Sequence, residues 1–186
     1  MLEARADGFS LIEVLVASSI LVAAVVSLAE LGAISTRANT SAGRTSTAWL
    51  IAEAKMEQLR SLQWGFDADG GRLTDTSTDT ATMPESATGG VGLSPSPSGA
   101  LASNTTGYVD YLNAYGDVLG GSSSTPPTGT VYIRRWSIEP LPDSPDDTVV
   151  LQVLVRRSRK DGGIASAPSR QFDEARLIGV RTRKAR

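Results

Sequence analysis

A single uninterrupted apolar stretch near the start of the chain limits the possible folds more than any other feature. It runs from Phe9 to Ala29, reads FSLIEVLVASSILVAAVVSLA and carries one charged residue, Glu13. A helix rises about 1.5 Å per residue, so a helix of this length can cross the hydrocarbon core of a bilayer, which is about 30 Å thick. An unpaired carboxylate is costly there. The stretch therefore predicts a membrane anchor in which Glu13 needs a partner.

The helical pattern continues beyond the apolar stretch. No proline occurs between Phe9 and Trp64. One helical face is marked by residues three or four apart, namely Leu31, Ile34, Ala38, Ala42, Thr45, Trp49, Ala52, Met56 and Leu59. This spacing predicts one continuous helix from about Phe9 to about Gln63, roughly 80 Å long. We expect the members of this stripe from Trp49 onward to form the helix side of a helix-to-sheet core.

The middle of the chain, residues 65–107, is rich in glycine, serine, threonine, aspartate and proline and has few large apolar side chains. This composition predicts an irregular, partly mobile loop that buries too little apolar surface to form a core. A second loop is expected at Gly120–Gly129.

Strand-like segments dominate the last third of the chain. They are Tyr108–Leu112, Asp117–Leu119, Thr130–Ile138, Val149–Arg157 and Ala175–Thr182. Asn113–Gly116 is expected to be a hairpin turn, since Asn and Gly tolerate positive φ, and Pro140–Asp147 is expected to be a longer turn. Alternation predicts that Tyr132, Arg134, Trp136 and Ile138 share one face, as do Val149, Leu151, Val153 and Val155. The fold class is α+β, with an antiparallel sheet packed on one helix.

Cysteine and histidine are both absent from the sequence. Disulfides, thiolate or imidazole metal sites, cysteine nucleophiles and serine–histidine pairs are therefore excluded. No other catalytic constellation is evident. We expect a protein that is not an enzyme and that has no cofactor and no metal site.

Charge is distributed unevenly along the chain. Residues 1–155 contain 8 basic and 17 acidic side chains, whereas residues 156–186 contain 10 basic and 3 acidic ones. The first four basic residues of this end, Arg156, Arg157, Arg159 and Lys160, are candidate nucleic-acid contacts. Only Phe172 interleaves with the basic residues, although single-strand binding usually involves stacking on aromatic rings. A solvated basic face is the favoured interpretation, and DNA is a disfavoured partner.

The segment from Gly8 to Ala17, GFSLIEVLVA, resembles the processing site of type IV prepilins and of type II secretion pseudopilins. The resemblance implies cleavage after Gly8 by a prepilin peptidase, N-methylation of the new terminal residue Phe9, and an assembly role for Glu13 at the fifth mature position. In this family the methylated amine of one subunit lies near the Glu of another.

Two further segments resemble parts of the same superfamily. Ala48–Leu62, AWLIAEAKMEQLRSL, resembles the A-x-x-KxExLR segment of V-type minor pilins and I-type pseudopilins. Val131–Trp136, VYIRRW, resembles part of the C-terminal sheet of V-type minor pilins. The resemblance covers both ends of the chain and leaves the middle unmatched.

The resemblance implies a pilin-like fold in five parts. They are a leader (1–8), the transmembrane or filament-core half of the helix (9–30), its amphipathic half (31–64), a variable loop (65–107) and a β-sheet region (108–186). The implied function is a minor pilin of a type IV pilus, which primes, caps or decorates the filament. Implied partners are the membrane, other major and minor pilins, the prepilin peptidase and the inner-membrane assembly platform. The implied location is the inner membrane before assembly and a cell-surface pilus or periplasmic pseudopilus afterwards.

Four other interpretations stay open. One alternative is a pseudopilin of a type II secretion system, although such pseudopilins tend to be shorter. A DNA-uptake or adhesive minor pilin would use the basic end or the long loop. The leader has two acidic residues, and Arg5 is its only basic one. The remaining alternatives are a secretory signal peptide cut near Ala33 and an unprocessed membrane anchor.

Overall fold

In the described part of the chain, one long helix precedes six strands. The computed structural model describes residues 8, 10–120, 123–158 and 174–183. The chain forms two compact units, residues 1–42 and 43–186. The elements are α1 (Leu11–Ser61), β1 (Trp64–Phe66), β2 (Arg72–Thr74), β3 (Val109–Leu112), β4 (Tyr132–Leu141), β5 (Ser144–Arg157) and β6 (Glu174–Thr182).

Helix α1 is continuous over 51 residues, as the spacing of its apolar residues predicts. It begins after Ser10, whose carbonyl oxygen accepts hydrogen bonds from the backbone N–H groups of Glu13 (3.0 Å) and Val14 (3.2 Å). A serine followed three residues later by a glutamate is a typical helix start, and the carboxylate also lies at the favourable end of the helix dipole. The helix passes through Ala33 without a break.

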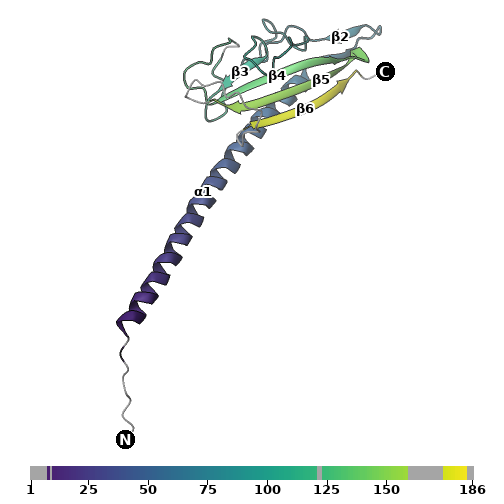
Figure 1. Ribbon diagram of the computed structural model, residues 1–186. Helices are drawn as coiled ribbons and strands as arrows, with labels where there is room; N and C mark the ends of the chain where they lie inside the picture. Colours follow the sequence, from purple (N-terminus) through teal and green to yellow (C-terminus); the bar gives the residue numbers. More distant parts are fainter. Residues whose placement is uncertain (1–7, 9, 121–122, 159–173, 184–186) are drawn as a thin grey trace. The chain divides into compact units, whose positions relative to one another are not determined.

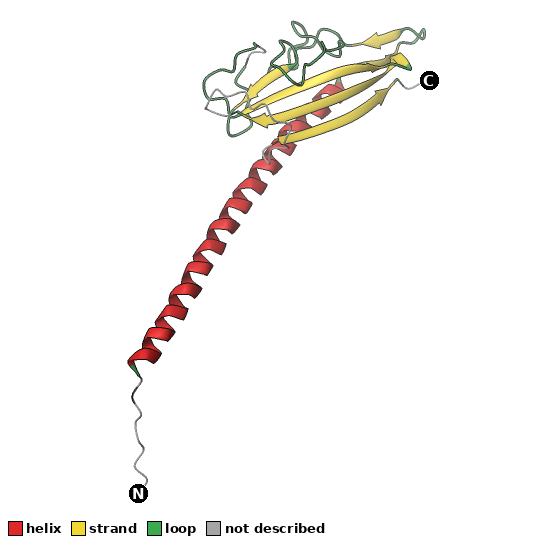
Figure 2. Cartoon of the chain, viewed as in Figure 1, coloured by secondary structure: helices red, strands yellow, loops and turns green. Residues whose placement is uncertain are grey.

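Strands β3–β6 form one antiparallel sheet in the order β3-β4-β5-β6, while β1 and β2 pair separately. The last turns of α1 lie against one face of this sheet (Figure 1). Figure 2 shows that irregular segments join most of the strands. The long pairing of β4 with β5 runs from Tyr132 opposite Arg157 to Leu141 opposite Ser144, and β6 adds to the other side of β5. The α+β arrangement is thus as predicted.

The core lies between this sheet face and the last turns of α1. On the helix side, Ala48, Ala52 and Leu59 have no exposed surface, and Met56 is 2% exposed. The two predicted strand faces are confirmed, because all eight of their members are buried: Tyr132, Arg134, Trp136, Ile138, Val149, Leu151, Val153 and Val155. Alternation along β4 and β5 was sufficient to identify the sheet face that meets the helix.

One member of the predicted helix stripe is placed differently. Trp49 is 47% exposed and does not belong to the core. The buried arc of the helix is centred on Ala48, Ala52, Lys55 and Leu59. Trp49 follows the buried Ala48 by one residue and therefore lies at the edge of this arc. The predicted step of four residues from Thr45 to Trp49 ends beside the buried arc, whereas a step of three ends on it at Ala48.

The segment 65–107 is more ordered than its composition predicts. It contains most of β1 and all of β2. Ala81, Leu93 and Ala100 are each at most 2% exposed and belong to the core. The segment was predicted to bury too little apolar surface to form a core, yet it contributes these three side chains to the core between α1 and the sheet. A few small apolar side chains are enough here, because backbone hydrogen bonds such as Leu93 N to Asp75 O (2.7 Å) hold the segment in place.

One turn is shorter than predicted, and one expected strand is reduced to a single bridge. Strands β4 and β5 extend into the expected Pro140–Asp147 turn, leaving Pro142 and Asp143 between them. Pro140 is accommodated at a register shift, where a ladder hydrogen bond is not required. The turn at Asn113–Gly116 is confirmed, with Gly116 at φ +90°, but the segment after it forms only one bridge, Leu112 to Val118, and no strand.

The packing of α1 on the sheet predicts a sharp contrast between two leucines on the same helix. Leu59 is fully buried and Leu50 is 66% exposed. We expect Leu59→Ala to lower the free energy of unfolding by about 2–5 kcal/mol, because it leaves a cavity in the core. Leu50→Ala should change it by less than about 0.5 kcal/mol. Urea unfolding of the full-length chain in detergent micelles, followed by tryptophan fluorescence, measures both. Equal losses in the two variants would contradict the placement of the core.

Candidate functional site

The start of α1 carries the predicted processing and assembly residues. Gly8 and Ser10 are exposed and precede the helix, and Glu13 is exposed in its first turn. Phe9 lies outside the described residues. Within those residues Glu13 has no ion pair. Gly8 is thus accessible to an enzyme, and the Glu13 carboxylate is free to contact another molecule.

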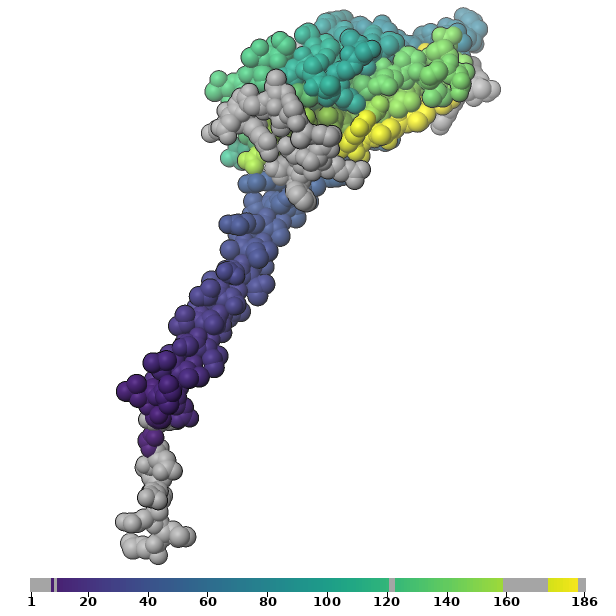
Figure 3. Space-filling view, viewed as in Figure 1, coloured from purple at the N-terminus to yellow at the C-terminus, as the bar shows by residue number. Residues whose placement is uncertain are grey.

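The first half of α1 is apolar and uncovered. An 18-residue window in this helix has none of its surface buried and is long and apolar enough, by composition, to cross a membrane. Large side chains such as Ile20 (66%) and Leu28 (68%) are mostly exposed. Figure 3 draws this half of the helix as a space-filling surface, in purple and blue. The hydroxyls of Ser18, Ser19 and Ser27 donate to backbone carbonyls one turn earlier, so they remain satisfied without water. Such a surface needs lipid or a partner chain to cover it.

In the second unit, a buried cluster of charged side chains joins α1 to β3 and β4. Lys55 of α1 is fully buried, and its Nζ lies 3.2 Å from Oδ2 of Asp110 in β3. The Nη2 of Arg134 in β4 donates to the same carboxylate oxygen at 2.7 Å. Lys55 also donates to the backbone carbonyl of Thr80 and lies 3.6 Å from the ring centroid of Trp136. Every charged group of the cluster therefore has partners from a different element.

The environment of Lys55 changes its proton affinity. Burial lowers the pKa of Lys55 to about 8, because desolvation penalises the ammonium, and repulsion from Arg134 adds to this, while attraction to Asp110 acts in the opposite direction. A structural ion pair explains these contacts fully. The helix is anchored to the sheet by this pair and by the hydrogen bond from Arg134 Nη1 to the Ile51 carbonyl (3.1 Å).

The sequence contained one signal for this cluster. Lys55 occupies a position on the buried arc of α1, between Ile51 and Leu59 at helical spacing, and it is the lysine of the KxExLR segment. An unpaired lysine there would be costly, so a carboxylate was required on the facing sheet. Asp110, in the otherwise apolar strand VDYL, is that residue. The pairing of Lys55 with Asp110 was not among the predictions from the sequence.

Among the described residues, two arginines of the basic C-terminal end bind the helix end and β1 instead of forming an exposed face. Arg181 donates to the Leu59 (3.2 Å) and Leu62 (2.7 Å) carbonyls at the end of α1, and the buried Arg183 stacks on Trp64 and donates to the Gly65 carbonyl at 2.8 Å. These two arginines are therefore structural.

Of the four candidate nucleic-acid contacts, the structure describes Arg156 and Arg157. Arg156 lies 3.4 Å from Glu174, and Arg157 is exposed. Because successive side chains of a strand point to opposite faces, these two do not share a surface. Arg159 and Lys160 lie outside the described residues. The structure thus does not bring the two described candidates, Arg156 and Arg157, to one surface.

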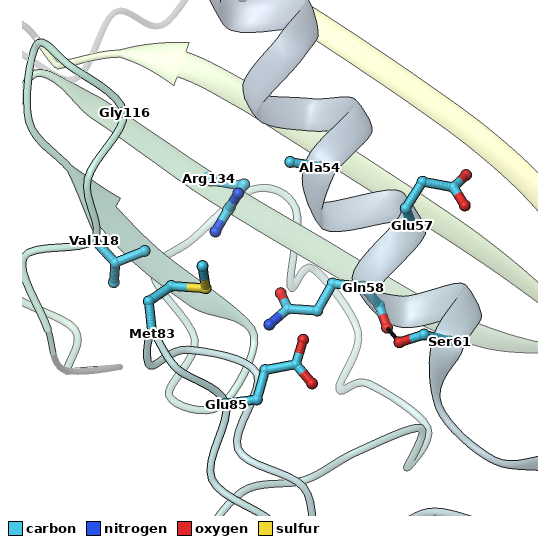
Figure 4. Close-up of a pocket in the computed structure, with 9 residues that line it drawn as sticks. All are labelled: Ala54, Glu57, Gln58, Ser61, Met83, Glu85, Gly116, Val118 and Arg134. Carbon is cyan, nitrogen blue, oxygen red and sulfur yellow. Dashed lines mark hydrogen bonds between the residues drawn. The ribbon is translucent and has the colours of Figure 1, made fainter.

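A hollow of about 400 Å³ lies beside the second half of α1, on the side that faces two loops. It is lined by Ala54, Glu57, Gln58, Ser61, Met83, Glu85, Gly116, Val118 and Arg134 (Figure 4). Three of its polar groups come from three different elements: Gln58 from α1, Glu85 from the 75–108 loop and Arg134 from β4. This hollow could not be predicted from local sequence patterns, because its walls are far apart along the chain.

No family model, no curated protein and no solved structure matches this chain.

The lowered pKa of Lys55 predicts how stability depends on pH. Between pH 8 and about 10.5 the unfolded chain binds more protons at Lys55 than the folded chain does, so the free energy of unfolding rises with pH in this window. From pH 7.5 to 9.5 we expect a gain of about 1–2 kcal/mol relative to Lys55→Met, which lacks the titrating group. The window stops there because burial raises the pKa values of Tyr108 and Tyr111, which act in the opposite direction at higher pH.

Urea unfolding of both proteins across this window measures the difference. If Lys55→Met does not fold, Lys55→Arg, which keeps its charge at these pH values, serves for the same comparison. Parallel pH profiles for the wild type and the variant would show that Lys55 does not titrate in this window.

Proposed function

We propose that this chain is a minor pilin of a type IV pilus, cleaved after Gly8 and assembled through the first half of α1. The observation that carries the proposal is the GFSLIE motif at the head of one continuous helix. The apolar half of that helix is uncovered, whereas its last turns belong to a folded α+β unit. An anchor and a folded unit on one uninterrupted helix are what a filament subunit needs.

Glu13 is the residue that would set the assembly register. After cleavage, the methylated amine of Phe9 remains cationic, and a neighbouring subunit would bring such an amine close to Glu13 in an apolar filament core. In a low dielectric the attraction is strong, and an unpaired charge is costly. A wrong axial offset between subunits would leave both charges unpaired, so the pair would select one offset.

In this proposal the inner membrane holds the chain before assembly, with the prepilin peptidase and the assembly platform as partners there. The pilus and its other pilins hold the chain afterwards. No catalysis by the chain itself is part of the proposal.

A pseudopilin of a type II secretion system is the nearest alternative, because it shares the cleavage motif and the helix. A DNA-uptake role receives less support, since Arg181 and Arg183 are bound to backbone carbonyls.

The N-terminal mass of the protein tests processing directly. From native membranes and from sheared surface filaments, we expect a chain that starts at N-methylated Phe9. A Gly8→Leu variant should stay at full length, because a side chain at this position crowds the peptidase site. Cleaved protein that is missing from filaments would favour a pseudopilin. An intact Met1 in the wild-type protein would refute the proposal and favour a plain membrane anchor.

Replacing the assembly carboxylate should separate insertion from incorporation. We expect Glu13→Val to insert in the membrane and to be cleaved, but to fall to less than about a tenth of the wild-type amount in sheared filaments, because it leaves a neighbour's amine unpaired. Glu30→Val is the matched control, since Glu30 is the next acidic residue of the same helix. Immunoblots of membrane and filament fractions give both amounts. Normal incorporation of Glu13→Val would rule out the register role.

A further inference from the structure

Strand β6 is the last strand of the sheet, and it leaves one edge open. All nine of its residues, Glu174–Thr182, pair with β5 in a regular register. On the other side of β6, no backbone hydrogen bond from the described residues reaches the strand. The opposite edge of the sheet is covered, because Leu119 N donates to Tyr111 O of β3 at 2.9 Å. The backbone groups along the open edge of β6 are therefore available to another strand.

The hydrogen-bond pattern shows which backbone groups face this open edge. The N–H of Arg183 donates to Asp147 O of β5, so the backbone groups of every second residue before Arg183 also point to β5. The N–H and C=O groups of Ile178 and Val180 therefore point away from β5. The side chains of Ile178 and Val180 are also exposed, by 62% and 64%. Free backbone groups and exposed apolar side chains thus occur at the same positions of the strand.

Edge strands are usually protected against pairing, and β6 has little of this protection. Common devices are a proline, a β-bulge or a very short strand. Strand β6 has none of these over its nine residues. Arg176 is its one exposed charged residue, and the Nη2 atom of Arg176 donates to Gln152 of β5. Figure 3 shows β6, in yellow, along the border of the folded unit. The open edge is therefore long and regular enough to bind another strand.

The flank of α1 below this edge adds apolar surface. The Sδ atom of Met56 lies 3.4 Å from the point that a Cβ at Gly179 would occupy, so Met56 faces β6. Trp49 precedes Met56 by seven residues, which is about two helical turns, and therefore lies on the same flank of α1. Trp49 is 47% exposed. A strand added to β6 would place one row of side chains over this flank and the other row beside Ile178 and Val180.

The charges at this edge favour one kind of strand. Arg176 and Arg181 belong to β6, and Arg183 follows directly after it. Glu174 is the only acidic residue of the strand, and it lies 3.4 Å from Arg156. A second copy of β6 would bring the same arginines to this edge, so like charges would meet. An acidic strand would bring opposite charges.

We propose that the open edge of β6 is a docking site for an extended acidic segment of a partner polypeptide, which adds a fifth strand to the sheet. Main-chain hydrogen bonds to Ile178 and Val180 would supply affinity, and the alternate side chains of the segment would supply specificity. The docking site rests on the proposed function only in that the partner would then be another subunit or an assembly protein.

Binding of two labelled peptides to the full-length chain in detergent micelles tests the site. The probes are fluorescein-labelled Glu-Thr-Val-Thr-Val-Thr-Glu, in which the acidic and apolar side chains share one face of a strand, and the same peptide with lysine in place of glutamate. Fluorescence anisotropy gives the affinities. We expect the acidic peptide to bind at least about fivefold more tightly than the basic one. In nuclear magnetic resonance spectra, the backbone amide signals of Ile178 and Val180 should shift on binding.

A proline on the open edge tests the main-chain contacts. Val180→Pro removes an N–H group that points away from β5, so the hydrogen bonds between β5 and β6 are kept. We expect this variant to bind the acidic peptide about tenfold or more weakly. Val180→Thr is the matched control, because it keeps the N–H group and a β-branched side chain, and it should lose no more than about threefold.

A charge reversal tests the choice of an acidic segment and does not depend on how well the proline variant folds. Arg176→Glu should remove the preference for the acidic peptide. Arg37→Glu makes the same charge change in the other compact unit, residues 1–42, and should preserve the preference.

Four outcomes would overturn the proposal. They are no binding of the acidic peptide at its solubility limit, equal binding of both peptides to the wild type, an unchanged affinity in folded Val180→Pro, and an unchanged preference in Arg176→Glu. A wild-type dimer in analytical ultracentrifugation that Val180→Pro abolishes would show instead that a second copy occupies the edge. These outcomes do not depend on cleavage at Gly8 or on filaments, so failure of this site and failure of the proposed function remain distinguishable.

Discussion

The ion pair between Lys55 and Asp110 is the contact that fixes how the helix sits on the sheet of the folded unit. Burying an ammonium and a carboxylate is costly unless each finds its partner, and both have no exposed side-chain surface. A rotation of α1 by one residue, or a shift by one turn, would leave both charges buried and separated. Apolar side chains alone tolerate such shifts better. We infer that the pair contributes more to the register of the helix on the sheet than to net stability.

The end of α1 shows how the fold holds its sheet without a disulfide. The last carbonyl groups of a helix have no partner within it, and here Arg181 of the edge strand donates to two of them. Arg183 continues the same role beyond the strand, because it stacks on Trp64 and donates to the Gly65 carbonyl. Two basic residues of the C-terminal end, Arg181 and Arg183, thus connect β6 to the end of the helix and to β1. Cationic donors and carbonyl acceptors take the place of a covalent link at the C-terminal end of the described chain.

Periodicity predicted most of the fold, because the elements that form the core have regular patterns. The continuous helix and the inward faces of β4 and β5 follow from spacings of three to four and of two residues. Trp49 shows the limit of this reasoning, since a stripe in steps of three or four drifts around the helix and cannot show where the sheet begins to cover it. Leu93 shows another limit: one leucine in a polar loop has no period, and only the tertiary backbone contacts bury it.

The candidate sites differ in predictability for the same reason. Gly8 and Glu13 belong to a local motif, so the sequence suffices to propose them. Lys55 and Asp110 are 55 residues apart along the chain, and only the packing of α1 on the sheet that contains β3 and β4 brings them together. The hollow at Gln58 and Glu85 has no local pattern at all. Sites that depend on long-range contacts between unlike elements cannot be deduced from the spacing of residues in one chain.

The surface of α1 provides a further constraint on what the protein does. Its first half exposes large apolar side chains on all sides, and exposure of this kind is unfavourable for a chain alone in water. Exposed apolar side chains continue to Ile34 (61% exposed), residues 35–47 are mostly polar, and Leu50 beyond them is 66% exposed. Under the proposed function, membrane lipid would cover this apolar surface before assembly and similar helices would cover it afterwards.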